Sequence, residues 1–222
     1  MNTPDLNALR PVATSPTPAL IADQLRARII DGTFGPGTQM TEAHLSERLG
    51  VSRGPVREAM QRLIQEGLLV NIRNRGVFVV ELGADDIVDI YTARAAVERH
   101  AAALLRRAGD PRTLDALDAI VDDMAAHAHR NRWDRLAELD LTFHEALVGA
   151  TGSPRLARMF ATLAAETRIC LTNLADAYPQ QHTLVDEHRH LVTLLRTGTE
   201  RQLLTAVDNH LASAVRDLTT RT

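Results

Sequence analysis

Residues 52–59, Ser52-Arg53-Gly54-Pro55-Val56-Arg57-Glu58-Ala59, decide the fold of the first part of the chain. Ser52 has the side chain of an N-cap, so a helix is expected to begin at Arg53. Pro55 then falls in the first turn, where a missing N–H costs nothing. Apolar residues repeat at helical spacing through the following turns. The stretch therefore predicts a helix that turns Arg53 and Arg57 toward solvent.

Shorter elements on both sides of this helix predict a winged helix-turn-helix. Upstream, residues 18–30 carry one apolar helical face, and Thr41 can cap a second, short helix. Downstream, residues 69–72 and 77–80 are rich in β-branched side chains, as strands are. The Arg73-Asn74-Arg75-Gly76 segment between them suits a tight turn. Two strands joined in this way form the wing of such a fold.

The charge of the chain is concentrated where this unit would meet DNA. The whole chain has a formal net charge of −3, but residues 48–75 hold six Arg against two Glu. Residues 81–222 are acidic and have no electrostatic reason to lie on DNA. Winged units also serve as protein-interaction modules, and paired arginines often only solvate a helix face. The two further arginines of the wing favour DNA binding.

The 222 residues, 45% hydrophobic, predict two globular domains after a tail. We expect a flexible tail at 1–17, a DNA-binding domain at 18–82 and an all-helical domain at 83–222. The fold class is mainly α. No apolar run approaches membrane-spanning length and no secretion signal begins the chain, so we expect a cytoplasmic protein without membrane contact. Cys170 is the single cysteine and is interpreted as an inert buried thiol.

The second domain is predicted to be a helical bundle, because its segments are rich in Ala and Leu at helical spacing. The predicted breaks between them lie at Gly109-Asp110-Pro111, Asn131-Arg132, Gly149 to Pro154, Tyr178-Pro179 and Gly198. The helices are expected at residues 84–108, 111–130, 133–150, 154–177, 181–197 and 199–219.

Four groups able to bind a metal lie on apolar helix faces of this bundle: Asp140, His144, His188 and His210. Burying them without partners would cost several kcal/mol or more. One divalent cation would satisfy all four, and an oxygen with three imidazoles suits Zn²⁺, Ni²⁺, Co²⁺ or Mn²⁺, with zinc favoured. A single inward histidine is more often a hydrogen-bonded core residue than a metal ligand. The convergence of four, two of them one helical turn apart, favours a metal site.

Arg94 is a further inward residue, on the first helix of the bundle. An unpaired buried guanidinium is unfavourable, so Arg94 is expected either to bind an acidic ligand or to form an internal bridge with Asp or Glu. Arg168 lies at the edge of the apolar face of its helix, so its side chain is only marginally placed to reach a ligand pocket beside Arg94.

A metal-dependent enzyme with a DNA-binding appendage is an alternative function, but no inward Glu, Ser or Tyr is evident beside the four ligands. A purely structural metal is a second alternative.

The N-terminal pattern resembles the DNA-binding domain of the GntR family of bacterial transcription regulators. The residues that carry the resemblance are Leu20, Phe34-Gly35-Pro36-Gly37, Leu45-Ser46-Glu47-Arg48-Leu49-Gly50-Val51, the stretch 52–59 and Glu66-Gly67-Leu68. The resemblance implies that Ser52, Arg53 and Arg57 contact bases and phosphates, and that residues 73–76 enter the minor groove as the wing. Gly54 departs from the family pattern, where Thr is common. Ala43 stands where Arg is often found.

The bundle is similar to the FCD effector domain of the FadR branch of that family, in its smaller VanR-like version with six helices. The segments that resemble its ligand signatures are Asp140-Leu141-Thr142-Phe143-His144, Glu187-His188-Arg189-His190-Leu191 and Asn209-His210-Leu211. Arg94 and Glu98 match the Arg-x-x-x-Glu pattern, whose Arg helps relatives to hold an acidic ligand. The expected function is that of a homodimeric, ligand-responsive transcription repressor on double-stranded DNA, with a small organic acid as effector. One small DNA-binding unit alone would offer too little interface for a selective operator.

Overall fold

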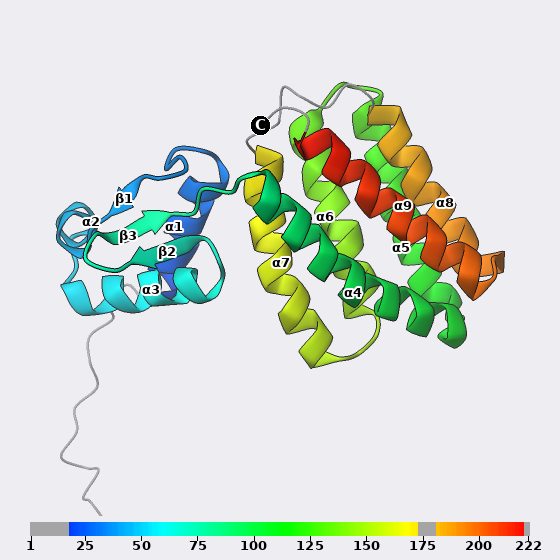
Figure 1. The fold of residues 1–222 in the computed structure, drawn as a ribbon, viewed down its shortest axis with the longest axis horizontal. Helices are drawn as coiled ribbons and strands as arrows, with labels where there is room; N and C mark the ends of the chain where they lie inside the picture. The colour runs from blue at the N-terminus through cyan, green and yellow to red at the C-terminus, as the bar shows by residue number, and fades with distance from the viewer. Residues whose placement is uncertain (1–17, 173–180, 220–222) are drawn as a thin grey trace, which may run out of the picture.

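The computed structural model describes residues 18–172 and 181–219 (Figure 1). The tail at 1–17, the end of the helix expected to reach residue 177 and the break expected at Tyr178-Pro179 lie outside the described residues. The described chain is mainly helical, with one small sheet. Its elements, in order, are α1 (Pro18–Ile30), β1 (Gln39–Met40), α2 (Glu42–Leu49), α3 (Arg53–Gln65), β2 (Leu69–Ile72), β3 (Gly76–Val79), α4 (Ala84–Ala108), α5 (Pro111–Ala128), α6 (Trp133–Gly149), α7 (Pro154–Thr172), α8 (Gln181–Thr197) and α9 (Glu200–Thr219).

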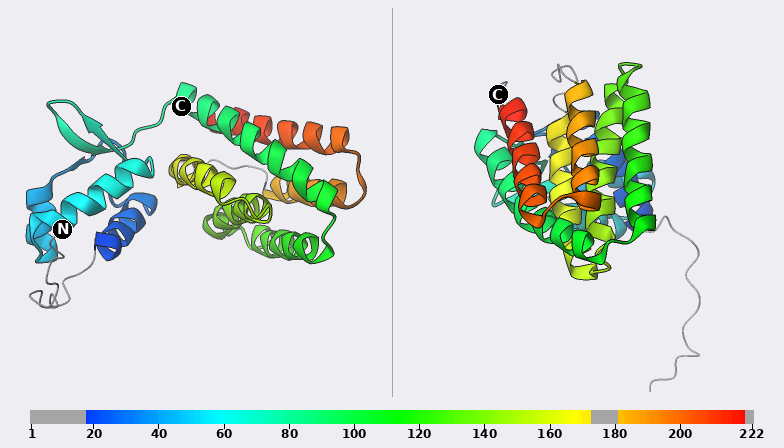
Figure 2. Two further views of the ribbon diagram at one scale, coloured as in Figure 1. Left: turned by 90° about the horizontal axis from the view of Figure 1, so that it is seen from below. Right: turned by 90° about the vertical axis from the view of Figure 1, so that its right-hand side faces the viewer.

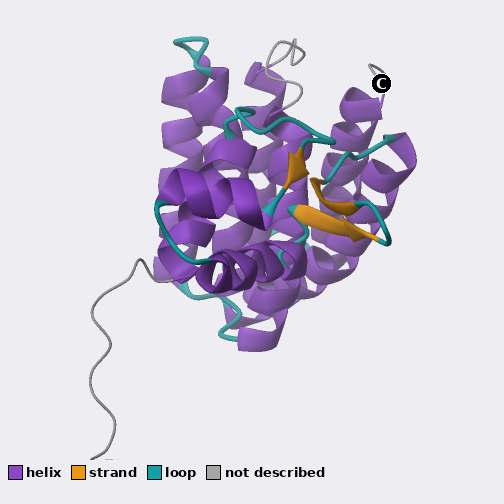
Figure 3. Cartoon of the chain, turned by 90° about the vertical axis from the view of Figure 1, so that its left-hand side faces the viewer, coloured by secondary structure: helices purple, strands orange, loops and turns teal. Residues whose placement is uncertain are grey.

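The elements α1 to β3 form a winged helix-turn-helix unit (Figure 3). Its antiparallel sheet has the strand order β1-β3-β2, and Leu69 of β2 stands opposite Val79 of β3. The core of the unit lies between the sheet and the three helices, and its members include Ile21, Val56 and Leu63. The predicted helices and the β2–β3 wing are confirmed, whereas β1 was not foreseen from the sequence.

Local geometry explains where these elements begin and end. The Thr41 hydroxyl accepts a hydrogen bond from the backbone N–H of His44 at 3.4 Å, and Gly50 ends α2 with a φ of 65°. Asn74 has a φ of 63° in the wing turn, a conformation that Asn tolerates better than most residues. Ser52 occupies the N-cap position of α3, but its side chain makes no capping hydrogen bond. The predicted N-cap position of Ser52 and the predicted helix start at Arg53 are therefore confirmed, without the side-chain bond that often accompanies such a cap.

The elements α4 to α9 pack into a bundle around a second hydrophobic core (Figure 2). Helix α4 packs along α9, while α5 lies between α6 and α8. Asp110 caps α5 by accepting from the backbone N–H of Thr113 at 3.1 Å, and Gly109 ends α4 with a φ of 59°. These breaks lie where the sequence predicts them. Among the described residues, no helix combines the length and the hydropathy needed to cross a bilayer.

Helix α7 and the segment before α4 join the bundle to the winged unit. Ile169 of α7 is buried in the core of the winged unit, and Leu82 packs against both cores. Helices α1 and α7 are in contact, and in Figure 2 α7 lies on the side of the bundle nearest the winged unit. A Cβ added to Gly67, in the turn after α3, would lie 2.8 Å from Glu166 Oε1 of α7. This junction therefore has close side-chain packing.

Candidate metal centre and DNA-reading face

The sequence-predicted DNA-reading residues all lie exposed on the winged unit. Ser52, Arg53 and Arg57 stand at the start of α3, and Arg73, Asn74, Arg75 and Gly76 form the wing turn. The backbone carbonyl of Arg75 accepts a hydrogen bond from Gln39 Nε2 at 2.9 Å, so β1 braces the wing. The Arg75 guanidinium lies 5.5 Å from the centre of the Phe78 ring. The exposed start of α3 and the wing thus present four arginines to solvent.

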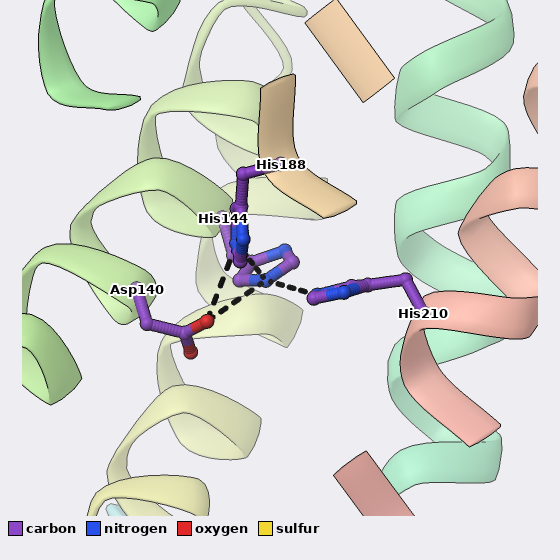
Figure 4. A group of neighbouring side chains, drawn as sticks. All are labelled: Asp140, His144, His188 and His210. Atoms are coloured by element: carbon purple, nitrogen blue, oxygen red, sulfur yellow. Dashed lines mark hydrogen bonds and ion pairs between the residues drawn. The ribbon is translucent and has the colours of Figure 1, made fainter. Parts of the chain in front are cut away.

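Asp140, His144, His188 and His210 come together inside the bundle (Figure 4). Asp140 and His144 lie one turn apart on α6, His188 comes from α8 and His210 from α9. All four residues are buried, and one ligand atom from each lies within 4.8 Å of the others. The convergence that the helical phases predict is therefore present in the structure.

The spacing of the ligand atoms fits a small divalent cation. His144 Nε2 lies 3.1 Å from His210 Nε2 and 3.3 Å from His188 Nε2. Asp140 Oδ1 lies 3.2 Å from His188 Nε2 and 3.8 Å from His144 Nε2. Metal–ligand bonds of about 2.0–2.1 Å at tetrahedral angles would place ligand atoms about 3.3 Å apart.

The outer nitrogen of each imidazole has its own partner. His188 Nδ1 donates to the Leu184 carbonyl at 2.8 Å, and His210 Nδ1 donates to Glu187 Oε2 at 2.7 Å. His144 Nδ1 lies 2.6 Å from Glu98 Oε2. A carbonyl or carboxylate oxygen can only accept, so Leu184 and Glu187 place the proton of the neutral form of His188 and His210 on Nδ1, and the Glu98 carboxylate favours the same tautomer of His144.

The three Nε2 lone pairs then point at one another. With the rings in this neutral form and no cation, Nε2 atoms near 3 Å apart would repel, because none of them would then carry a proton to donate. A metal ion bound by all three nitrogens would accept their lone pairs and remove this repulsion. Metal-binding imidazoles commonly have a hydrogen-bond partner on their other ring nitrogen, as these three rings do. The residues present therefore fit a bound divalent metal.

Titration of the site also favours ligation. Burial lowers the pKa of His210 to about 4, with a further contribution from His188, so this ring is neutral near pH 7. Burial opposes ionisation of Asp140, but the imidazoles around it, His188 first, lower the pKa of this carboxyl below its usual range. A neutral imidazole and an ionised carboxylate are the forms that bind metals.

Arg94 forms a buried bridge to Glu98, which sequence reasoning left open as one of two alternatives. Arg94 Nε donates to Glu98 Oε1 at 2.8 Å, and both side chains are 1% exposed. Burial alone would raise the pKa of Glu98, but Arg94 and His144 lower it to about 2. Glu98 therefore connects Arg94 to His144, one of the candidate metal ligands. The expectation that no inward Glu or Tyr stands beside the ligands is wrong, because Glu98 and Tyr91 are both buried there.

A small internal cavity lies between Arg94 and the ligand cluster. Its volume is about 10 Å³, and its lining comprises Tyr91, Arg94, Trp133, Asp140, His144, Leu171, Leu184, His210 and Ala214. This is about the volume that one water molecule requires. A carboxylate can enter only if the surrounding helices move apart. Arg168 does not line the cavity; its guanidinium lies 3.7 Å from Glu145.

A larger groove approaches the cluster from outside, between α8 and α9. It has a volume of about 510 Å³ and is lined in part by Glu187, His190, Arg201 and Asn209. His210 lines both this groove and the inner cavity. The His210 side chain, with its partner Glu187, is thus the ligand nearest the groove.

Comparison with known proteins assigns both halves of the chain. Residues 19–79 match the model of bacterial regulatory proteins of the gntR family, and residues 89–213 match the FCD domain. The HTH-type transcriptional regulator YdhC of Bacillus subtilis is 30% identical, with 79% of this chain and 80% of that protein covered. The gluconate operon transcriptional repressor of Bacillus licheniformis is 27% identical over 80% of this chain and 74% of its own length. A transcriptional regulator GntR from Rhodococcus sp. RHA1 has a similar structure, with a TM-score of 0.77, 28% identity and coverage of 92% of this chain and 98% of that one.

Proposed function

Because the chain belongs to the gntR family of bacterial transcription regulators, which are not enzymes, and carries an FCD domain, we propose that it is a homodimeric repressor controlled by a small organic acid. The observation that carries the proposal is the buried chain of contacts from Arg94 through Glu98 to His144, beside three converging imidazoles. It would act on double-stranded DNA in the cytoplasm. Repression is proposed because a relative is named as the repressor of a gluconate operon.

Asp140, His144, His188 and His210 would hold the metal, with Zn²⁺ favoured over Ni²⁺, Co²⁺ and Mn²⁺. The bound metal supplies a Lewis acid that attracts a carboxylate. Arg94 and Glu98 offset each other's charge beside the same cavity, whereas one Asp offsets only part of the charge of a divalent cation. The cavity therefore favours an anion over a neutral molecule.

The cavity adjoins the two elements that lead to the winged unit. Tyr91 and Arg94 lie on α4, which follows the wing directly, and Leu171 lies on α7 two residues after Ile169. An acid that enters the 10 Å³ cavity has to displace these walls. We infer that this displacement changes how the winged unit is placed, provided that the acid binds one arrangement more tightly than the other.

DNA recognition is predicted to depend on Arg53 and Arg57. Arg53→Ala or Arg57→Ala should weaken binding to a DNA fragment selected by the wild-type protein from a random pool. A lost base contact costs about 1–3 kcal/mol and relaxes specificity, while a lost phosphate contact mainly reduces the salt dependence. Fluorescence anisotropy at several salt concentrations measures both effects. Unchanged affinity and salt slope in both variants would contradict DNA docking through α3.

The acid response is predicted to need both the metal and Arg94. Sugar acids, hydroxy acids and dicarboxylates are titrated against DNA complexes of metal-loaded, metal-free and Arg94→Lys protein, with uncharged sugars as a comparison. An active acid should change the DNA affinity of the loaded protein by about 5- to 150-fold. Arg94→Lys keeps the charge opposite Glu98 but loses the planar fork, so its response should be much smaller.

Arg99→Lys is the matched control, because Arg99 lies on the same helix and pairs with Asp208, away from the cavity. It should respond as the wild type does. A response that survives in both metal-free protein and Arg94→Lys, or that occurs only with uncharged sugars, would exclude the anion pocket.

A further inference from the structure

Arg57 of α3 is held by an acidic residue of the preceding helix. Arg57 Nε donates to Glu42 Oε1 and Arg57 Nη2 donates to Glu42 Oε2, each at 2.7 Å. The hydrogen bond from Arg57 lowers the pKa of the Glu42 carboxyl. Arg57 is 63% exposed and Glu42 30%, so the pair lies at the surface beside the start of α3.

This two-point contact fixes the plane of the guanidinium and leaves one edge of it open. A guanidinium has five N–H donors in a planar fork. Glu42 takes the Nε donor and one Nη2 donor, so the Nη1 end and the second Nη2 donor still point away from the carboxylate. Two N–H groups in one plane are what a bidentate contact with a guanine edge needs. Glu42 therefore orients Arg57 without blocking such a contact.

The same carboxylate works against contacts that carry no sequence information. Non-specific binding depends on cations that neutralise phosphates and release counterions. With Glu42 attached, Arg57 no longer adds a full positive charge to the surface, and a phosphate that approached it would also meet the carboxylate. A base edge has no formal charge and does not suffer this repulsion.

We propose that Glu42 is a specificity-determining positioning residue, which aims Arg57 at a base edge and lowers the affinity for unrelated DNA. The proposal rests on the DNA-reading role proposed for α3. Glu42 is also the first residue of α2, where an acidic side chain favours the helix dipole. A role limited to helix stability would change the melting temperature but leave the preference among DNA sequences unchanged.

The test compares Glu42→Gln with wild type on two DNA fragments, one selected by the wild-type protein from a random pool and one with the same bases scrambled. Glu42→Gln keeps the size of the side chain but removes its charge. It should bind scrambled DNA more tightly, with a salt slope steeper by about 0.9. The ratio of selected to scrambled affinity should fall at least about fivefold, the lower end of what one bidentate contact discriminates.

Glu47→Gln is the matched control, since Glu47 is an exposed acid on the same helix. It removes the same charge and should leave the affinity ratio within about twofold of wild type. A ratio in Glu42→Gln that matches that of Glu47→Gln overturns the proposal. If Glu42→Gln fails to fold, Glu42→Asp keeps the charge with a shorter reach; an unchanged ratio in a folded Glu42→Asp protein would also overturn it.

Arg57→Ala separates this proposal from the docking model. In an Arg57→Ala background, adding Glu42→Gln should cause no further fall in the ratio, because Glu42 acts through Arg57. A further fall of the same size would show that Glu42 acts by another route, and the positioning role would be wrong. If Arg57→Ala and Arg53→Ala both leave DNA binding unchanged, the docking of α3 itself fails, which is a distinct outcome.

Discussion

Glu98→Ala should lower the free energy of unfolding by about 3–5 kcal/mol, because it leaves a buried guanidinium without its counter-charge. Arg94 and Glu98 are each 1% exposed, so bulk water does not solvate the guanidinium once its partner is lost. The same change removes the contact that orients His144 Nδ1. Urea denaturation measures the loss, and a metal chelator in every sample keeps metal binding out of the comparison.

Two further variants test the cause. Glu138→Ala removes the acid of the exposed Arg135–Glu138 pair and should cost less than about 1 kcal/mol. The double variant Arg94→Met/Glu98→Leu removes both buried charges and should recover much of the stability that Glu98→Ala loses. A loss for Glu98→Ala as small as that for Glu138→Ala would show that the bridge does not hold Arg94 in the folded protein.

Most of the fold follows from signals within single segments. The boundaries of α4 and α8 agree with those predicted, because Gly, Pro and Asn breaks separate long stretches of helical spacing. Strand β1 was missed because two residues are too few to show alternation. Its identity depends on pairing with β3, more than thirty residues later in the chain. The unused cap at Ser52 shows that a suitable residue type does not fix a side-chain rotamer.

The cluster of Asp140, His144, His188 and His210 was predictable because each of them lies on an apolar helix face, where a polar side chain stands out. Its outer partners were harder to foresee. Glu187 is next to His188 in sequence but binds His210 of the next helix. The periodicity of α8 alone cannot tell how close α9 approaches. Glu98 lies four residues after Arg94, a spacing that signals a bridge, yet its second contact, with His144 of α6, depends on the packing of α4 against α6.

Likewise, the Glu42–Arg57 pair joins two helices across the turn of the winged unit, fifteen residues apart. The sequence predicts that Arg57 faces solvent, and its side chain is exposed. It does not predict which neighbour the side chain meets. Contacts between elements, rather than the elements themselves, are therefore what sequence periodicity leaves undetermined in this protein.

Removal of the metal should destabilise the bundle strongly. With free Zn²⁺ a thousandfold above its dissociation constant, bound metal contributes about 4 kcal/mol to the free energy of unfolding. At about 2–4 °C per kcal/mol for a chain of this size, chelation should lower the melting temperature by about 8–16 °C. Differential scanning calorimetry in buffered Zn²⁺ and in chelator measures this, with Ni²⁺, Co²⁺ and Mn²⁺ compared in the same way. If none of these metals raises the melting temperature, the proposed site is wrong.

His188→Ala is the variant that locates the effect. The His188 side chain is fully buried, and its Nδ1 bonds only to the carbonyl of Leu184 in its own helix. Its removal therefore deletes a ligand together with its contacts to Asp140 and His144 inside the site, whereas His210→Ala would also break the contact with Glu187 of α8 outside the site. His190, two residues along and exposed, provides the matched control His190→Ala. His188→Ala should lose most of the metal-dependent rise in melting temperature while His190→Ala retains it. An equal rise in both would place the metal elsewhere in the protein.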